Sequence, residues 1–170
     1  MEENLETHSD EVDSIVAAWQ VQRSDFDAQP LAVFSRLLRL GRYIDRIRRT
    51  IFAQYDLETW EFEMLAALRR SGEPFQLTAG QLMNETLVSS GTITNRIMRM
   101  QDSGLIERLP DQNDRRVVYV KATPKGITQV DSAMEALLNE QRKQLAGFSE
   151  QEIRQARDFL KQMIENIDNC

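Results

Sequence analysis

The sequence predicts a mainly α-helical protein that carries one small β-hairpin, and three observations support this fold class. Apolar residues recur at helical spacing through most of the 170 residues. Two short runs with strand character, residues 105–109 and 117–122, flank a turn-forming Pro-Asp-Gln-Asn segment. Two short helical segments joined by a tight turn precede this hairpin. Together these parts form the pattern of a winged helix-turn-helix.

The two short helices have clear start signals. The first is expected over residues 79–86, because Thr78 and Gln81 stand at the spacing of a capping box, in which two side chains bond the N–H groups at the helix start. A short turn follows it. Ser89 or Ser90 can then cap the second helix.

The second short helix is expected to end near Asp102 and to have two contrasting faces. Ile93, Ile97 and Met100 recur at i, i+4 and i+7 and predict a buried face. The opposite face carries hydroxyls, an amide and guanidinium groups, with no acid before Asp102. Gly104 is expected to end the helix in a left-handed conformation.

A unit of this kind can place its second helix in the major groove of DNA and its wing in the adjacent minor groove. We therefore expect the polar helix face and the wing tip to contact DNA. An internal ion pair between Arg116 and Asp114 is compatible with such a contact and remains an alternative. The candidate DNA-binding residues are Ser90, Thr92, Thr94, Asn95, Arg96, Arg99, Arg115 and Arg116.

The hairpin region resembles the wing signature of the MarR family of bacterial transcriptional regulators, which is D-x-R followed by V-x-L-T-x-K-G. The spacing is intact, and Ala122 stands where the family usually has Leu. The resemblance implies a non-enzymatic regulator, typically a repressor, that binds double-stranded operator DNA. The matching residues are Asp114, Arg116, Val120, Thr123, Lys125 and Gly126.

The resemblance also implies one MarR-type domain over residues 1–170. Its expected parts are a helical dimerisation region, residues 10–55 and 124–170, and a DNA-binding region, residues 56–126, with the wing at 105–122. Long terminal helices on a small unit cannot bury their apolar stripes alone, and in the family they pair in a twofold homodimer. Two recognition helices roughly 34 Å apart would then fit a pseudo-palindromic operator.

The helix expected over residues 10–22 is an addition to the six-helix core of the family. The run 15–23, followed by Asp25, Asp27 and Pro30, looks like the start of PecS-type proteins, a urate-responsive branch that also includes HucR. That branch is marked by a Trp in the added helix, an acid before the DNA-binding unit, an Arg in the recognition helix and an Arg before the wing. The corresponding residues are Trp19, Glu61, Arg96 and Arg108.

The resemblance implies that these four residues bind a small anionic ligand such as urate. A planar purine would pack on the Trp19 indole, and its charge would pair with Arg96 or Arg108. Glu61 could accept a ring N–H. Ordinary roles remain open: apolar packing for Trp19, a surface ion pair between Glu61 and Arg108, and phosphate contact for Arg96. An aromatic acid or a polycarboxylate is an alternative ligand.

The charge distribution agrees with DNA binding better than the net charge of −6 does. Residues 1–30 hold one basic and eight acidic side chains. Residues 31–55 hold six basic and one acidic side chain, and residues 76–126 hold seven basic and five acidic side chains. We expect the basic residues of 31–55 to form a solvated face and ion pairs with the acidic first helix. Phosphate contact by one or two of them is the alternative.

Few chemical groups support another function. His8 and Cys170 are single residues of their type, so we expect no zinc site, no Cys-His nucleophile and no cofactor. The chain has no apolar run of membrane-span length and no signal peptide, which favours a cytoplasmic, nucleoid-associated bacterial protein. Two alternatives remain: a thiol redox sensor that uses Cys170, and a winged-helix scaffold that binds proteins.

Overall fold

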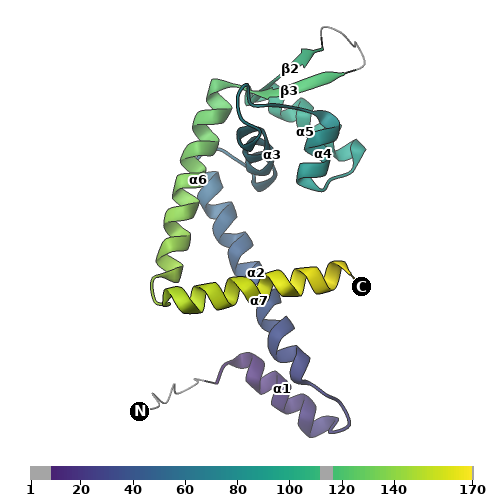
Figure 1. The fold of residues 1–170 in the computed structure, drawn as a ribbon, viewed down its shortest axis with the longest axis vertical. Helices are drawn as coiled ribbons and strands as arrows, with labels where there is room; N and C mark the ends of the chain where they lie inside the picture. The colour runs from purple at the N-terminus through teal and green to yellow at the C-terminus, as the bar shows by residue number, and fades with distance from the viewer. Residues whose placement is uncertain (1–8, 112–116, 170) are drawn as a thin grey trace. The chain divides into compact units, whose positions relative to one another are not determined.

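The computed structural model describes residues 9–111 and 117–169, and the chain divides into two compact units, residues 1–50 and 51–170. The described part is mainly helical with one small antiparallel sheet (Figure 1). This confirms the predicted fold class. Within the described residues, no helix is long and apolar enough to cross a membrane. The single-domain assignment and its dimerisation region stay predictions.

The first unit contains helix α1 and most of helix α2. α1 covers Glu11–Gln22, and α2 covers Gln29–Ala53 and so continues into the second unit. α1 starts where the sequence predicts, because the Asp10 carboxylate accepts hydrogen bonds from two N–H groups of the first turn and the Asp13 carboxylate accepts one from Asp10. This reciprocal pair is a capping box.

An apolar cluster joins α1 to the start of α2. Val12 and Val16 of α1 are buried together with Ala28, and the partly buried Leu31 and Ala32 pack against them. Each fully buried Val contributes about 1.5–3 kcal/mol relative to exposure. Val12 and Val16 of this short helix are therefore covered within their own unit.

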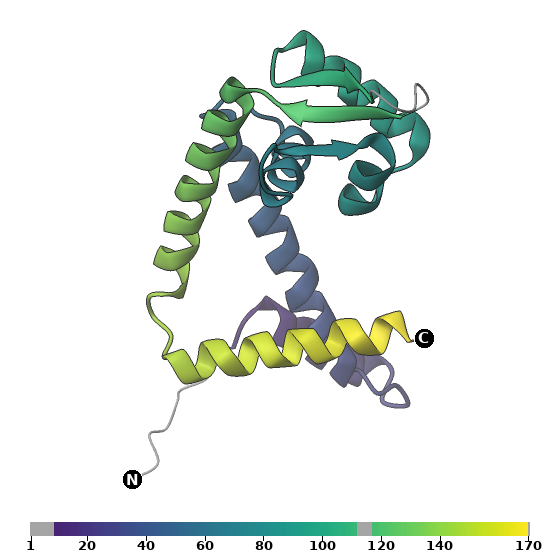
Figure 2. The same ribbon diagram turned by 45° about the horizontal axis from the view of Figure 1, so that its top comes forward.

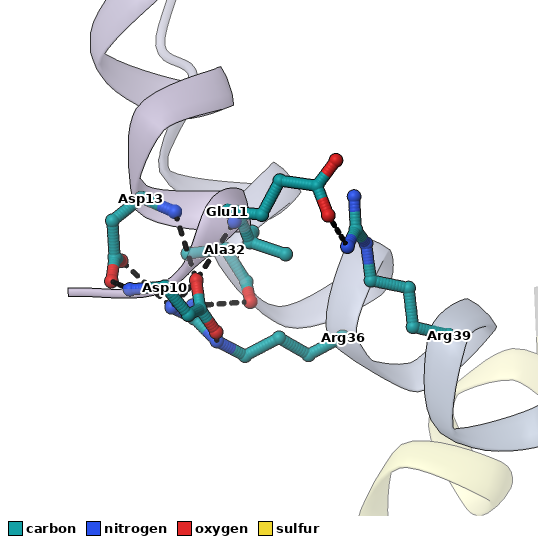
Figure 3. Close-up of polar contacts among 7 residues, drawn as sticks. Asp10, Glu11, Asp13, Ala32, Arg36 and Arg39 are labelled. Carbon is teal, nitrogen blue, oxygen red and sulfur yellow. Dashed lines mark hydrogen bonds and ion pairs between the residues drawn. The ribbon is translucent and has the colours of Figure 1, made fainter. Parts of the chain in front are cut away.

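Ion pairs strengthen the same contact (Figure 3). The Arg36 guanidinium bonds Asp10 and Asp13 at 2.8 and 2.7 Å, and Arg39 pairs with Glu11. Hydrogen bonds from the two guanidinium groups lower the pKa of Asp10, Asp13 and Glu11, because they favour the charged carboxylates. The predicted pairing of α2 with the acidic first helix is thus confirmed for Arg36 and Arg39.

The second unit contains the winged helix-turn-helix. Helices α3 to α5 precede a β-hairpin, and two longer helices follow it (Figure 1). The elements are α3 (Thr59–Arg70), α4 (Ala79–Thr86), α5 (Ser90–Asp102), β2 (Ile106–Pro110), β3 (Val118–Ala122), α6 (Pro124–Leu145) and α7 (Glu150–Asp168). The predicted bounds of the first short helix and the Asp102 end of the second are confirmed.

The sequence pattern did not predict a third strand, β1, at Gln76–Thr78. It pairs antiparallel with β3, so the sheet order is β1-β3-β2 (Figure 2). Leu77 lies opposite Val120 in this pairing. Three residues are too few to show the alternation by which strands are recognised. Because Thr78 also caps α4, β1 connects the sheet directly to the helix-turn-helix.

One apolar core joins the end of α2, helices α3 to α6 and strand β3. Phe52 and Phe62 stack with ring centroids 3.9 Å apart. The predicted buried face of α5 is confirmed for Ile93, Ile97 and Met100. The largest fully buried side chains of this core are Phe52, Met64, Leu65, Leu68, Leu82, Met100, Val120 and Val130.

Residues of the wing signature fix the start of α6 against the end of α5. The Thr123 hydroxyl donates to the Gly104 carbonyl at 2.8 Å and accepts from the Gly126 N–H at 3.1 Å. The Lys125 ammonium donates to the Ser103 carbonyl at 2.8 Å. Gly104 has φ +71°, so it ends α5 in the predicted left-handed conformation. The signature therefore has a structural role that is independent of any ligand.

Gly126→Ala should destabilise the second unit. A Cβ at this position would lie 2.3 Å from the Leu105 carbonyl oxygen and 2.9 Å from Leu65 Cδ2, and the backbone oxygen cannot move aside. We expect a loss of about 1–3 kcal/mol of unfolding free energy, as for other overpacked sites. The measurement is thermal or denaturant unfolding followed by circular dichroism. Gly41→Ala is the control, because nothing lies within 4 Å of its added Cβ; equal stability of both variants would contradict the close packing.

Acid should loosen α1. Because Arg36 and Arg39 depress the pKa of Asp10, Asp13 and Glu11 in the folded state, the stabilisation is fully present above the ordinary carboxyl pKa of about 4 and is lost as the pH falls through the folded values. Hydrogen exchange of the α1 amides, corrected for intrinsic rates, measures this loss. Arg36→Gln should lower protection at neutral pH and flatten its pH dependence. Unchanged α1 protection in that variant would contradict the ion-pair contribution.

Candidate nucleic-acid interface

Burial of one side of α5 determines which residues the other side presents. Ile93, Ile97 and Met100 face the core, whereas Thr92 and Asn95 are exposed. α4 ends at Leu87 in the left-handed region, and Ser89 is the extended N-cap of α5. The tight turn between the two helices thus holds the polar face of α5 on the surface of the unit.

The side chains of this face differ in their free hydrogen-bonding capacity. The hydroxyls of Ser89 and Thr92 bond each other at 3.0 Å, and the Thr94 hydroxyl donates to the Ser90 carbonyl at 3.1 Å. No hydrogen bond joins the Asn95 amide to another described residue. Asn95 therefore presents two donors and one acceptor, the set that matches the edge of adenine in the major groove.

A crevice of about 380 Å³ lies along this face. The guanidinium carbons of Arg96 and Arg99 lie 5.3 and 4.9 Å from the ring centroid of Trp60 in α3. Arg99 is exposed and Arg96 is partly buried. No described acidic side chain lines the crevice, so the charge of its described wall is positive. Its lining residues are Trp60, Gly91, Thr92, Asn95, Arg96 and Arg99.

The position of Trp60 corrects an expectation from the sequence. Its spacing with Met64 and Leu68 predicts one buried stripe, but only Met64 and Leu68 are fully buried. Trp60 is partly buried and its ring meets the arginines of α5. Periodicity gave no signal for this role, because Trp60 lies in the first turn of α3, where a stripe residue can project beyond the core.

The structure describes the two strands of the wing but not residues 112–116 between them. Asp114, Arg115 and Arg116 lie outside the described residues, so their contacts with DNA stay predictions. Arg108 is exposed on β2 and lies opposite Val120 of β3. The next residue pair, Glu107 and Lys121, forms a cross-strand ion pair of 3.4 Å.

The four predicted effector residues belong to both units. Trp19 lies in the first unit, and Glu61, Arg96 and Arg108 lie in the second. Glu61 is 9% exposed, and its Oε2 accepts the Glu58 N–H at 2.9 Å as part of the α3 capping box. Among the described residues, no ion pair joins Glu61 to Arg108. Glu61 therefore has a local structural role that the sequence analysis did not assign.

Trp19 is 45% exposed and is not part of the α1 core. Its ring centroid lies 6.0 Å from that of Phe26, and the two rings help to line a cavity of about 460 Å³. Asp25 and Asp27 also line this cavity. Arg23 pairs with Asp25 at 2.6 Å, so one of the two negative charges is balanced locally.

No group of metal-ligating side chains occurs among residues 9–111 and 117–169. Cys170 lies outside this described part, so its proposed redox role stays untested. The chemistry of the described surface is therefore that of recognition through guanidinium, amide and hydroxyl groups.

Comparison with known proteins agrees with this geometry. A model described as MarR family matches residues 55–117. The HTH-type transcriptional regulator PecS of Dickeya dadantii (strain 3937) is 33% identical over 94% of this chain and 96% of its own. The structure of AbsC, a MarR family regulator from Streptomyces coelicolor, has a TM-score of 0.73 at 18% identity, with coverage of 85% of this chain and 97% of AbsC.

A second structural neighbour is the organohalide-sensing regulator RdhR in its 2,4-dichlorophenol-bound form. It has a TM-score of 0.71 at 18% identity and covers 97% of this chain and 89% of its own. At this identity the two structures support the fold alone. The match to PecS extends over nearly the whole of both chains, and the chain accordingly belongs to the MarR family of DNA-binding transcriptional regulators.

Proposed function

We propose that the protein is a homodimeric repressor that binds a pseudo-palindromic operator and is released by a small anionic ligand. The observation that carries the DNA part is the acid-free crevice on α5, in which Asn95 is free to hydrogen bond and Arg99 is exposed. Two such helices one DNA turn apart would read two half-sites. The fold and the family support this arrangement.

The proposed DNA contacts divide into three kinds. Thr92, Thr94, Asn95 and Arg99 contact base edges, because short hydroxyls, an amide and a guanidinium fit the major groove. Ser90, near the start of α5, and Arg96, near its middle, contact the sugar-phosphate backbone of the DNA. Arg115 and Arg116 serve the wing, where a narrow A·T-rich minor groove attracts guanidinium groups.

The proposal of a homodimer rests on apolar side chains that each unit leaves exposed. α7 has no buried residue, yet Phe159, Leu160, Ile164 and Ile167 lie on it at 41–61% exposure. Phe34 and Leu38 of α2 are also exposed. A second copy that covers residues 10–55 and 124–170 would remove this apolar surface from water.

Similarity to PecS and the surroundings of two residues support an anionic effector. Trp19 offers an accessible indole, and Nη1 of Arg96 is buried without a hydrogen-bond partner among the described residues. The acids beside Trp19 do not favour an anion, and under this proposal Arg96 or Arg108 would supply the positive charge. Urate, an aromatic acid and a polycarboxylate all carry the required charge.

Such a ligand would act on DNA binding through α5. A carboxylate or urate oxygen that recruits Arg96 would withdraw a positive charge from the helix that contacts DNA. By thermodynamic linkage, DNA would weaken ligand binding by the same factor. Glu61 would accept a ring N–H of the ligand beside its bond to the Glu58 N–H, because a carboxylate can accept several hydrogen bonds.

Operator binding tests the DNA part. Fluorescence anisotropy of a labelled duplex from the promoter beside the protein's own gene should give an affinity that falls steeply with salt, as several phosphate contacts require. Arg99→Ala should relax base preference at one position of each half-site and cost about 1–3 kcal/mol. Arg142→Ala, which removes the same charge from the last turn of α6, should change little. An absence of salt-dependent affinity for DNA would favour the protein-scaffold alternative.

Release by urate tests the effector part. Addition of urate to the same complex should lower the anisotropy, and Trp19→Phe should require more urate because the larger indole face is lost. The salt concentration is kept fixed in this comparison. If Trp19→Phe responds like the wild-type protein, Trp19 is not in the site. Tight operator binding that is indifferent to urate would retain the regulator and reject this ligand.

A further inference from the structure

We propose that Trp60 is a positioning residue that determines how sharply α5 discriminates between DNA sequences. The inference rests on the proposed DNA-binding function and assigns a role to a residue outside α5. Trp60 lies in the first turn of α3, and its indole ring is the shared contact of two arginine side chains of α5. No other aromatic side chain lines the crevice.

The two arginines have no other anchor among the described residues. Arg96 and Arg99 form no ion pair with a described carboxylate, and the crevice wall contains no acid. Two like charges three positions apart on one helix repel each other. The attraction of both guanidinium groups to the face of one ring opposes this repulsion. Trp60 is therefore the contact that restricts their conformations.

A ring is better suited to this task than a carboxylate would be. A carboxylate would hold an arginine through its N–H groups and cancel its charge, so that neither would be available to DNA. A guanidinium over a ring face keeps its positive charge, and its N–H donors stay free at its edge. Trp60 can thus preorganise Arg99 for bidentate bonding to a guanine without competing for the same donors.

The two arginines are held to different extents. Nη1 of Arg96 is buried without a partner among residues 9–111 and 117–169, whereas Arg99 is exposed. The ring therefore keeps Arg96 partly withdrawn and presents Arg99 to the groove. Without the ring, Arg99 would sample conformations that reach phosphates as readily as bases. Specific binding would then weaken while non-specific binding persisted.

The test compares Trp60→Leu with Trp60→Phe. Leu retains an apolar side chain but has no ring face, and Phe retains a smaller face. Affinity is measured for the operator, for the operator with one substituted base pair per half-site, and for an unrelated duplex at the same salt. Trp60→Leu should lower the preference for the operator by roughly twofold to fivefold per α5, the size of an exposed cation–π contact. The preference of Trp60→Phe for the operator should lie between that of Trp60→Leu and that of the wild-type protein.

A double-mutant cycle separates positioning from a general structural effect. If Trp60 acts through Arg99, Trp60→Leu should have little further effect on operator preference in an Arg99→Ala background. The affinity for the unrelated duplex and the salt dependence should stay unchanged. Additive losses, or equal losses on operator and unrelated DNA, would overturn the proposal.

A spectroscopic measurement on the wild-type protein makes the test independent of how the variants fold. The NMR resonances of the Nε–H groups of Arg96 and Arg99 should be displaced by the Trp60 ring current, and ordinary chemical shifts would overturn the proposed contact.

Failure of this inference can be told apart from failure of the proposed function. If the wild-type protein shows no preference for the operator, the proposed function itself fails. If it does discriminate, and Trp60→Leu discriminates equally well, only this inference fails.

Discussion

Burial of one face of α5 is the constraint on which the rest of the structure depends. Ile93, Ile97 and Met100 pack into the core of the second unit, and at about 1.5–3 kcal/mol for each buried side chain this packing outweighs any single surface contact of the helix. Rotation of α5 about its axis would expose these residues. The positions of Asn95 and Arg99 on the surface are therefore consequences of apolar packing.

The C-terminal end of α5 is fixed as well as its buried face. β1 leads directly into the cap of α4, and Thr123 and Lys125 connect the start of α6 to the carbonyl groups of Ser103 and Gly104. Gly126 allows this approach because a larger residue would meet a backbone oxygen. A ligand that displaced α5 would consequently act on a rigid element and its neighbours together. That rigidity is the physical condition for coupling between an effector and DNA.

Local chemistry explains which features the sequence could predict. The Thr78–Gln81 capping box and the left-handed Gly104 each depend on residues within a few positions of one another, and both were predicted correctly. β1 has three residues and owes its existence to pairing with a strand more than 40 residues later, so no local pattern indicates it. Trp60 shares the periodic stripe of Met64 and Leu68 and yet lines the crevice, because periodicity records the direction of a side chain and not the depth of its surroundings. Grouping Trp19 with Arg96 depends on long-range arrangement in the same way.

The distribution of charge gives the acidic composition a physical meaning. Asp10, Asp13 and Glu11 are engaged by Arg36 and Arg39 within the first unit, so much of the acidity of α1 is compensated locally. The arginines of α5, in contrast, have an aromatic ring and no described carboxylate as their neighbour. Under the proposed mechanism, an anionic effector at Arg96 would supply the negative charge that the polar face of α5 lacks. Such a ligand would neutralise the DNA-binding face of α5 directly. The protein would then leave the operator even if the helix moved only slightly.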